Sequence, residues 1–269
     1  MNKLSLLFIA LPFLFSCSTE QRNQAPLKTE KGRTGTGTSS IINLTNEFDS
    51  INKLIRDNKI DRDAALLKIQ QLLPEIKATY FKPGDKNEAR ESRVFPLRGY
   101  SFKAIGGKNG SGYIPQGYDY FDGDRHKGHP AHDIFIHDKN QDCMDDRTGK
   151  YVEVLSLSGG IVVATERNWD FGSTLRGGKC IWIYDPASNS LFYYAHNSQI
   201  LANTGQILEP GDIIARVGRT GLNAYKKRSP THLHIMQLQF DRRHYPLPID
   251  LYQTLRTIGT NKETEEQSL

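Results

Sequence analysis

The sequence predicts a mainly β protein, in which an antiparallel β domain follows a small α-helical hairpin. Apolar residues recur at three- and four-residue steps over residues 41–80, which is typical of amphipathic helices. After about residue 90, short apolar or alternating runs recur between turn signals, which indicates β-strands. The 269 residues include 24% charged and 37% hydrophobic side chains, a composition that supports a buried core. The formal charge of +5 is scattered along the chain, so we expect no nucleic-acid partner.

The N-terminus carries the pattern of an exported lipoprotein. Lys3 precedes an apolar run over residues 4–15, which is too short to span a bilayer and is typical of a secretory signal. Leu14 stands three residues before Cys17, and a small residue stands directly before the cysteine, a pattern that resembles a bacterial lipobox. The resemblance implies that residues 1–16 are a lipoprotein signal peptide and that Cys17 carries a lipid anchor. An ordinary signal peptide is the alternative.

A tether and a helical hairpin are expected before the β domain. Residues 17–40 are polar and cannot bury enough apolar surface to fold, so they are predicted to be a flexible tether. Residues 41–82 form the predicted hairpin, with Asp61 as a candidate N-cap of its second helix. Pro74 predicts that this second helix kinks or ends just before it. We expect the hairpin to brace the main domain, with a docking surface for a regulatory protein as the alternative.

The predicted β domain occupies residues 90–258, and the polar residues 259–269 are predicted to be a disordered tail. Its expected strands are residues 111–114, 133–136, 161–164, 180–184, 191–196, 212–217 and 233–240. Residues 185–190 are typical of a hairpin loop between two of these strands. Because no helical period of useful length interrupts them before residue 249, the strands should pair mostly antiparallel.

Metal-binding side chains gather in two short clusters about a hundred residues apart. His129 and Asp133 form the first cluster, and His232 and His234 form the second. In a β-strand, side chains two residues apart point to the same face, so His232 and His234 should point the same way. Each cluster alone is more often structural. Together with His196 on a third predicted strand, they indicate zinc, whose catalytic sites combine three His or carboxylate ligands with an open position.

The order of these motifs resembles that of the lysostaphin/LytM-type zinc peptidases, which cut bacterial peptidoglycan. That family pairs a His-x-x-x-Asp motif with a later His-x-His motif, and it carries a Tyr-x-His motif between them. The corresponding segments here are residues 129–133, 194–196 and 232–234. Glycine-rich turns at residues 205–211 and 217–221 also resemble those before the family's final motif.

The resemblance implies a two-sheet antiparallel β domain with an open groove and one Zn²⁺ per chain. His129, Asp133 and His234 would be the zinc ligands. His196 and His232 would be the catalytic histidines, one taking a proton from water and the other stabilising the oxyanion and the leaving amine. The sequence leaves open which histidine has which role.

Two further residues near these motifs are weaker candidates. By the two-residue period of a strand, Tyr194 shares a face with His196, so it could contact the substrate or support the metal site; a packing role is the alternative. His132 should point away from Asp133 and is not expected to bind the metal.

The two cysteines beyond Cys17 are Cys143 and Cys180. Export would place them in an oxidising compartment, which makes a disulfide between them a candidate. Residues 138–150, which include Cys143, are expected to be an inserted loop that shapes one wall of the groove.

The sequence therefore predicts a zinc endopeptidase that hydrolyses peptide bonds in peptidoglycan stem peptides or cross-links. It would be lipid-anchored in the cell envelope, on the periplasmic face of either membrane. Two alternatives remain: a non-catalytic activator of other cell-wall hydrolases, and a zinc amidase acting on peptidoglycan. All five family positions are kept, which favours an enzyme. The bond that is cut, and whether the helical hairpin blocks the groove, stay open.

Overall fold

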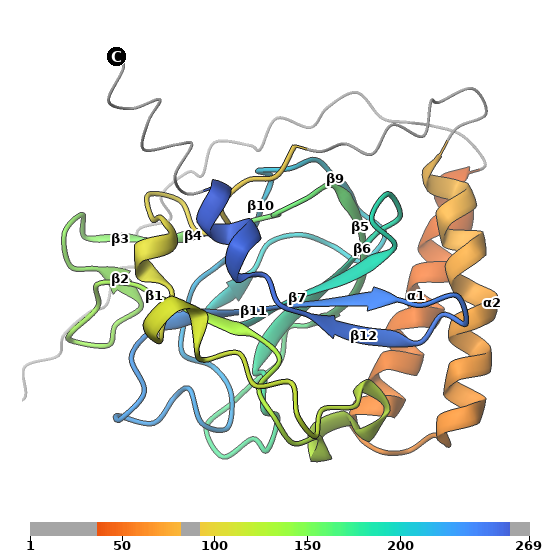
Figure 1. The fold of residues 1–269 in the computed structure, drawn as a ribbon, viewed down its shortest axis with the longest axis horizontal. Coiled ribbons are helices and arrows are strands. Elements are labelled where there is room, and N and C mark those ends of the chain that lie inside the picture. Colours follow the sequence, from red (N-terminus) through yellow and green to blue (C-terminus); the bar gives the residue numbers. More distant parts are fainter. Residues whose placement is uncertain (1–36, 82–91, 259–269) are drawn as a thin grey trace, which may run out of the picture. The chain divides into compact units, whose positions relative to one another are not determined.

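The structure, a computed structural model, describes residues 37–81 and 92–258 (Figure 1). The predicted signal peptide (1–16), the predicted lipidation site Cys17 and the predicted tail (259–269) lie outside the described residues. Within the described ranges, no helix combines the length and the apolar character that a membrane span needs.

Two helices form the predicted hairpin, α1 (Gly37–Arg56) and α2 (Arg62–Tyr80), and they pack against each other. The first turn of α1 includes residues that the sequence assigned to the tether, which was predicted to extend to residue 40. Asp61 caps α2 as predicted, because its carboxylate accepts hydrogen bonds from two backbone N–H groups in the first turn.

The prediction that α2 kinks or ends before Pro74 is wrong about the end, since the helix continues to Tyr80. A proline inside a helix costs about 3 kcal/mol or more, because it lacks an N–H group and crowds the preceding turn. The buried face of α2 continues across the proline: Leu72, Leu73 and Ile76 are at most 5% exposed. Burying each such side chain contributes about 1.5–3 kcal/mol, so packing outweighs the cost of the proline.

A seven-stranded antiparallel sheet forms the centre of the described domain, with the strand order β1-β11-β7-β6-β5-β9 and β12 paired to β11 (Figure 1). Its strands are β1 (His132–Phe135), β5 (Gly160–Glu166), β6 (Lys179–Asp185), β7 (Ser190–Asn197), β9 (Ile207–Leu208), β11 (His232–Phe240) and β12 (Pro246–Ile249). The predicted hairpin loop connects β6 to β7.

A smaller antiparallel sheet has the order β4-β10-β8, formed by β4 (Glu153–Leu155), β10 (Ile213–Arg216) and β8 (Gln199–Ile200). The segment predicted as an inserted loop, residues 138–150, contains a two-stranded ribbon of β2 (Met144–Asp145) and β3 (Lys150–Tyr151). The fold class is therefore confirmed as a two-sheet antiparallel β domain preceded by a helical hairpin.

The remaining helical segments are short. They are the 3₁₀ helices η1 (Phe102–Ala104), η2 (Lys108–Gly110) and η3 (Tyr120–Arg125), and residues 252–258. The strand predicted over residues 111–114 does not form; there, Ile114 makes only an isolated antiparallel bridge with His129.

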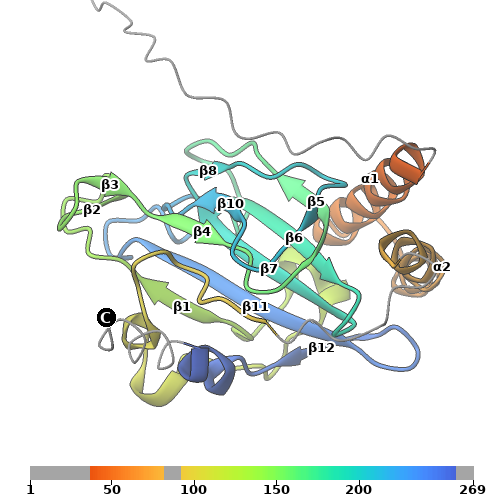
Figure 2. The ribbon, with the colours of Figure 1, turned by 90° about the horizontal axis from the view of Figure 1, so that it is seen from above.

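The large sheet buries both of its faces. Alternating side chains of β6 separate the two cores: Ile181 and Ile183 pack in the core shared with the small sheet, whereas Trp182 and Tyr184 pack in the core shared with the helices. Phe48 of α1, which is 1% exposed, belongs to the second core. Figures 1 and 2 show the helices beside the large sheet, away from the small one. The hairpin is thus a packed layer of the domain.

This packing makes the stability of the β domain depend on α2. Ile69 is fully buried between the helices and the sheet, and Leu67 on the same helix is 55% exposed. We expect Ile69→Ala to lower the free energy of unfolding by about 2–5 kcal/mol. The control Leu67→Ala should change it by about 0.5 kcal/mol or less. Urea denaturation followed by tryptophan fluorescence measures both, and an unchanged midpoint for Ile69→Ala would show that the hairpin is dispensable.

Candidate metal centre

All three predicted ligands converge where β1 pairs with β11. The antiparallel register places Asp133 directly opposite His234. Oδ1 of Asp133 lies 3.0 Å from Nδ1 of His234 and 3.4 Å from Nε2 of His129. The three ligand atoms all lie within 4.8 Å of one another. Tetrahedral zinc with bonds of about 2.0–2.1 Å requires donor separations of about 3.3 Å, so this donor set fits zinc.

The backbone fixes the orientation of the His129 ring. The antiparallel bridge between His129 and Ile114 holds the chain before β1, and Nδ1 of His129 lies 2.8 Å from the carbonyl oxygen of Gly112. A hydrogen bond from Nδ1–H to this carbonyl leaves Nε2 without a proton and directs it toward Asp133. The role of Gly112 was not predictable from the sequence, because every residue type supplies a backbone carbonyl group.

The two predicted catalytic histidines flank the same cluster. The ring centroids of His196 and His232 lie 4.9 Å apart, and those of His196 and His234 lie 5.4 Å apart. Nδ1 of His196 is 2.8 Å from the carbonyl oxygen of Thr220, and Nδ1 of His232 is 2.7 Å from that of Pro230. Both rings can donate from Nδ1, so Nε2 of each is free to accept a proton.

His232 and His234 share a face of β11 as predicted, and both line the cavity. The corresponding prediction for Tyr194 and His196 is wrong. Tyr194 is fully buried in the core below the sheet, where its hydroxyl accepts a hydrogen bond from the backbone N–H of Leu157. Its neighbour Tyr193 lines the cavity instead.

A β-bulge explains this exchange. Between two paired positions, β6 advances by two residues and β7 by three, so β7 contains one extra residue there. His196 lies in this stretch and has a left-handed backbone with a φ of 65°. The extra residue shifts the alternation of side chains, and His196 therefore points to the same side as Tyr193. A bulge of this kind is not visible in the periodicity of the sequence.

The charges of the cluster match what a metal requires. Burial raises the pKa of Asp133, but hydrogen bonds from His129 and His234 more than offset this and hold the pKa far below its ordinary value. Burial lowers the pKa of His234, and it lowers the pKa of His196 well below the ordinary value of 6.5. Asp133 is therefore ionised, and His196 and His234 are neutral, near pH 7.

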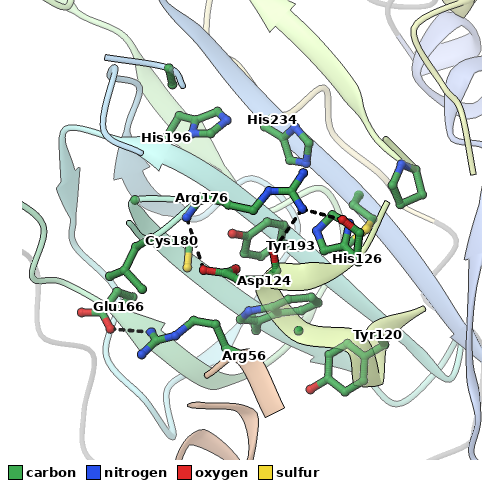
Figure 3. A pocket seen from close by; sticks show the side chains of 18 of the residues that line it. Arg56, Tyr120, Asp124, His126, Glu166, Arg176, Cys180, Tyr193, His196 and His234 are labelled. Carbon is green, nitrogen blue, oxygen red and sulfur yellow. Dashed lines mark hydrogen bonds and ion pairs between the residues drawn. The ribbon is translucent and has the colours of Figure 1, made fainter. Parts of the chain in front are cut away.

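A cavity of about 320 Å³ extends from this cluster across β6 and β7 to α1 (Figure 3). Its lining includes Arg56 of α1, Asp124 of η3 and Arg176 in the loop before β6. The prediction that residues 138–150 form one wall is wrong for this cavity, because α1 and η3 occupy that role. The wall was not predictable, since the packing of α1 on the sheet brings together segments far apart in the sequence.

His132 and His137, which lie next to the motif, are outside the cluster of candidate ligands. His132 points away from Asp133 as predicted, and its Nε2 lies 2.8 Å from Oδ1 of Asp250. His137 stacks on Tyr100 with ring centroids 6.0 Å apart and does not line the cavity.

The candidate disulfide does not form, since Cys143 and Cys180 are free thiols. Cys180 lies on β6, buried, and its thiol is hydrogen-bonded to Tyr193. The backbone N–H of Cys143 donates to the carboxylate of Asp138, in the segment that carries the β2–β3 ribbon. The fold thus gives the two cysteines separate environments.

The comparisons with known proteins agree with the resemblance seen in the sequence. Residues 140–245 match the model of peptidase family M23, a range that includes His196, His232 and His234 and begins after His129 and Asp133. The chain therefore resembles the lysostaphin/LytM-type peptidases, as the sequence predicted. No curated protein matches this chain.

Several solved structures are similar to the chain. A zinc-containing peptidase from Vibrio cholerae is 22% identical over 59% of this chain and 39% of that chain, with a TM-score of 0.38. Lysostaphin from Staphylococcus simulans is 20% identical over 62% of this chain and 56% of that chain, with a TM-score of 0.37. The chain thus spans less than two thirds of either protein. A putative glycyl-glycine endopeptidase LytM from Ruminococcus gnavus is 18% identical over 85% and 88% of the two chains, with a TM-score of 0.41.

Glycine usually destabilises a strand more than alanine does. At His196, whose backbone is left-handed, we expect the opposite order. We expect His196→Gly to be more stable than His196→Ala by about 1 kcal/mol. Alanine with positive φ costs about 1–2 kcal/mol, which exceeds the extra entropy that glycine gains in the unfolded chain. At Ala195, which is not among the residues with positive φ, the control Ala195→Gly should destabilise the protein. Thermal unfolding of the three variants tests this, and equal stability of the two His196 variants would contradict it.

Zinc affinity should depend on pH through one proton. Burial lowers the pKa of His129, but the neighbouring Asp133 raises it overall above its ordinary value of 6.5. Asp133 is ionised and His234 neutral in the same range, so only His129 must lose a proton to bind zinc. Affinity should fall about tenfold for each pH unit below the raised pKa and level off above it. Titration against a zinc chelator from about pH 5 to 8 measures the slope, with His137→Ala as an unchanged control. A flat profile would contradict this assignment of the ligands.

Proposed function

Starting from the match of residues 140–245 to peptidase family M23, we propose that this protein is a zinc-dependent endopeptidase that hydrolyses peptide bonds in peptidoglycan. The observation that carries the proposal is the convergence of a zinc-compatible donor set with two further histidines at one end of a cavity. The substrate bonds would be those of stem peptides or cross-links.

The chain's own residues divide the work of peptide hydrolysis. His129, Asp133 and His234 would hold Zn²⁺, which lowers the pKa of water toward about 7 and polarises a carbonyl group. Burial keeps His196 neutral, and its Nδ1 lies near the carbonyl oxygen of Thr220, so its Nε2 can accept the proton of the attacking water.

His232 is the candidate group for stabilising the oxyanion and for donating a proton to the leaving amine. Its Nε2 lies 3.8 Å from Oδ1 of Asp133, beside the proposed metal ligands. A protonated His232 can stabilise the oxyanion and pass a proton to the leaving amine. The site therefore offers one acceptor and one donor of protons, as the hydrolysis of an amide requires.

The place of action is also part of the proposal. A lipid anchor on Cys17 would hold the enzyme at the membrane and restrict cutting to the nearby cell wall. This rests on the lipobox-like sequence before Cys17, which lies outside the described residues. A regulatory partner at the helical hairpin would contact only the surfaces of α1 and α2 that face away from the sheet, because their buried faces belong to the domain core.

Digestion of purified bacterial sacculi tests the function. We expect the wild type to bind about one zinc per chain and to release shortened peptides. His234→Ala should lose both zinc and activity, because it removes a ligand. His232→Ala should keep zinc but lose about 10²–10⁴-fold in turnover, the usual contribution of a positioned proton-transfer group. His137→Ala, which changes an exposed histidine outside the cavity, serves as the control.

The masses of the released fragments separate the remaining alternatives. Cleavage within peptides supports the endopeptidase, whereas release of intact stem peptides from the sugar would indicate an amidase. Zinc binding without cleavage of any peptidoglycan would contradict an enzyme and favour a non-catalytic activator of other cell-wall hydrolases.

A further inference from the structure

The end of the cavity that lies toward α1 carries charged side chains that the chemistry at the metal does not use. Arg56 of α1, Glu166 of β5, Asp124 of η3 and Arg176 all line this part (Figure 3). A charged group that is partly removed from water must be paired, or it raises the free energy of the folded protein. The pairing of each group therefore shows which one is available to a ligand.

The two cations are already engaged. Nη1 of Arg56 lies 2.8 Å from the carboxylate of Glu166, and its Nε lies 2.7 Å from that of Asp57. Nη1 of Arg176 donates to the backbone carbonyl oxygens of Asp124 and His126. Both guanidinium groups thus have acceptors supplied by the chain itself.

Asp124 has no such partner. Among the described residues, its carboxylate accepts one long hydrogen bond, 3.4 Å from the backbone N–H of Arg176, and forms no ion pair. The side chain is half-buried. Burial raises the pKa of this carboxyl, and the charges of Arg56 and Arg176 only partly offset the effect. Asp124 is therefore an ionisable group in the cavity whose hydrogen-bonding capacity is largely unused.

The surrounding charges do not supply the missing partner. The guanidinium groups of Arg56 and Arg176 lie near Asp124, but Arg56 is paired with the carboxylates of Asp57 and Glu166. Arg176 donates to backbone carbonyl oxygens, and neither guanidinium group forms an ion pair with Asp124 among the described residues. The half-buried Tyr193 lies beside Asp124 in the cavity (Figure 3). The ring centroid of Tyr193 lies 6.0 Å from that of the metal ligand His234. The side chain of Tyr193 thus lies between the carboxylate of Asp124 and the candidate metal centre.

We propose that Asp124 binds a primary ammonium group of the peptide substrate, close to the bond that is cut. This proposal rests on the proposed peptidase function and names the feature of the substrate that the cavity selects. The ammonium group would form an ion pair with the carboxylate of Asp124 and donate hydrogen bonds to an acceptor that has only one weak donor. It could belong either to the side chain of a diamino acid or to the free N-terminus of a peptide.

A set of matched peptides distinguishes these sources. A stem peptide with one lysine is prepared with only its α-amine free, with only its side-chain amine free, and with both amines acetylated. Binding is measured by calorimetry on the zinc-loaded full chain carrying His232→Ala, so that the peptides are not consumed. Cleavage of the same peptides is measured separately with His232 intact. Asp124→Asn is compared with Asp122→Asn, which changes an aspartate of the same η3 segment outside the cavity lining.

We expect one of the two free-amine peptides to bind about 10- to 100-fold more tightly than the acetylated one, the usual effect of a hydrogen bond between charged groups. The peptide that gains affinity identifies the source of the ammonium group. Asp124→Asn should remove this preference, and Asp122→Asn should keep it. Zinc content and thermal unfolding of Asp124→Asn would show that the variant is folded.

Equal binding of all three peptides to the His232→Ala protein with Asp124 intact overturns the inference. An unchanged preference in Asp124→Asn overturns it as well. If the proposed peptidase function is wrong, none of the peptides is cleaved. The binding measurements decide the role of Asp124 independently of this result.

Discussion

The pairing of β1 with β11 is the constraint on which the candidate site depends. Its register sets Asp133 opposite His234, and the carboxylate lies within hydrogen-bonding distance of the imidazole. A shift of one residue along either strand would turn one of these side chains toward the core below the sheet. Apolar neighbours oppose such a shift, since Leu233 and Ile235 are fully buried on that side. The hydrophobic pattern of β11 therefore fixes the geometry of the metal centre.

Backbone carbonyl groups fix the orientation of the histidine rings in the cluster. Three of the four clustered histidines direct Nδ1 at a carbonyl oxygen, those of Gly112, Thr220 and Pro230. The corresponding loops are held in turn; Arg219, which is 9% exposed, donates to carbonyl oxygens of the segment between β10 and β11. These contacts select the ring tautomer and the direction of each Nε2 atom. The arrangement of the histidines is thus determined largely by main-chain geometry.

Much of this could be predicted from the sequence wherever a strand is regular. The two-residue period placed His232 and His234 on one face because β11 pairs without a bulge through this stretch. The same period failed for Tyr194, because the extra residue in β7 gives His196 a left-handed backbone and reverses the alternation. Local propensity likewise failed at Pro74, where tertiary packing outweighs the cost of a proline. Bulges and packing against distant segments leave no periodic signal in one sequence.

The helical hairpin links the stability of the fold to the shape of the cavity. The faces of α1 and α2 that close the core on one side of the large sheet also place Arg56 at the cavity's end. The hairpin therefore forms part of the boundary of the cavity, which extends from the clustered histidines to α1. A segment that stabilises the sheet thus also limits the space that the cavity offers to a ligand.

The most direct test of this account is anomalous diffraction at the zinc absorption edge from crystals of the protein grown with zinc. The account predicts one peak within bonding distance of Nε2 of His129, Oδ1 of Asp133 and Nδ1 of His234. His196 and His232 should lie outside bonding distance, so that one coordination position remains open to water or substrate. A peak bonded by His196 or His232 as a fourth protein ligand, or no peak at this cluster, would contradict the account.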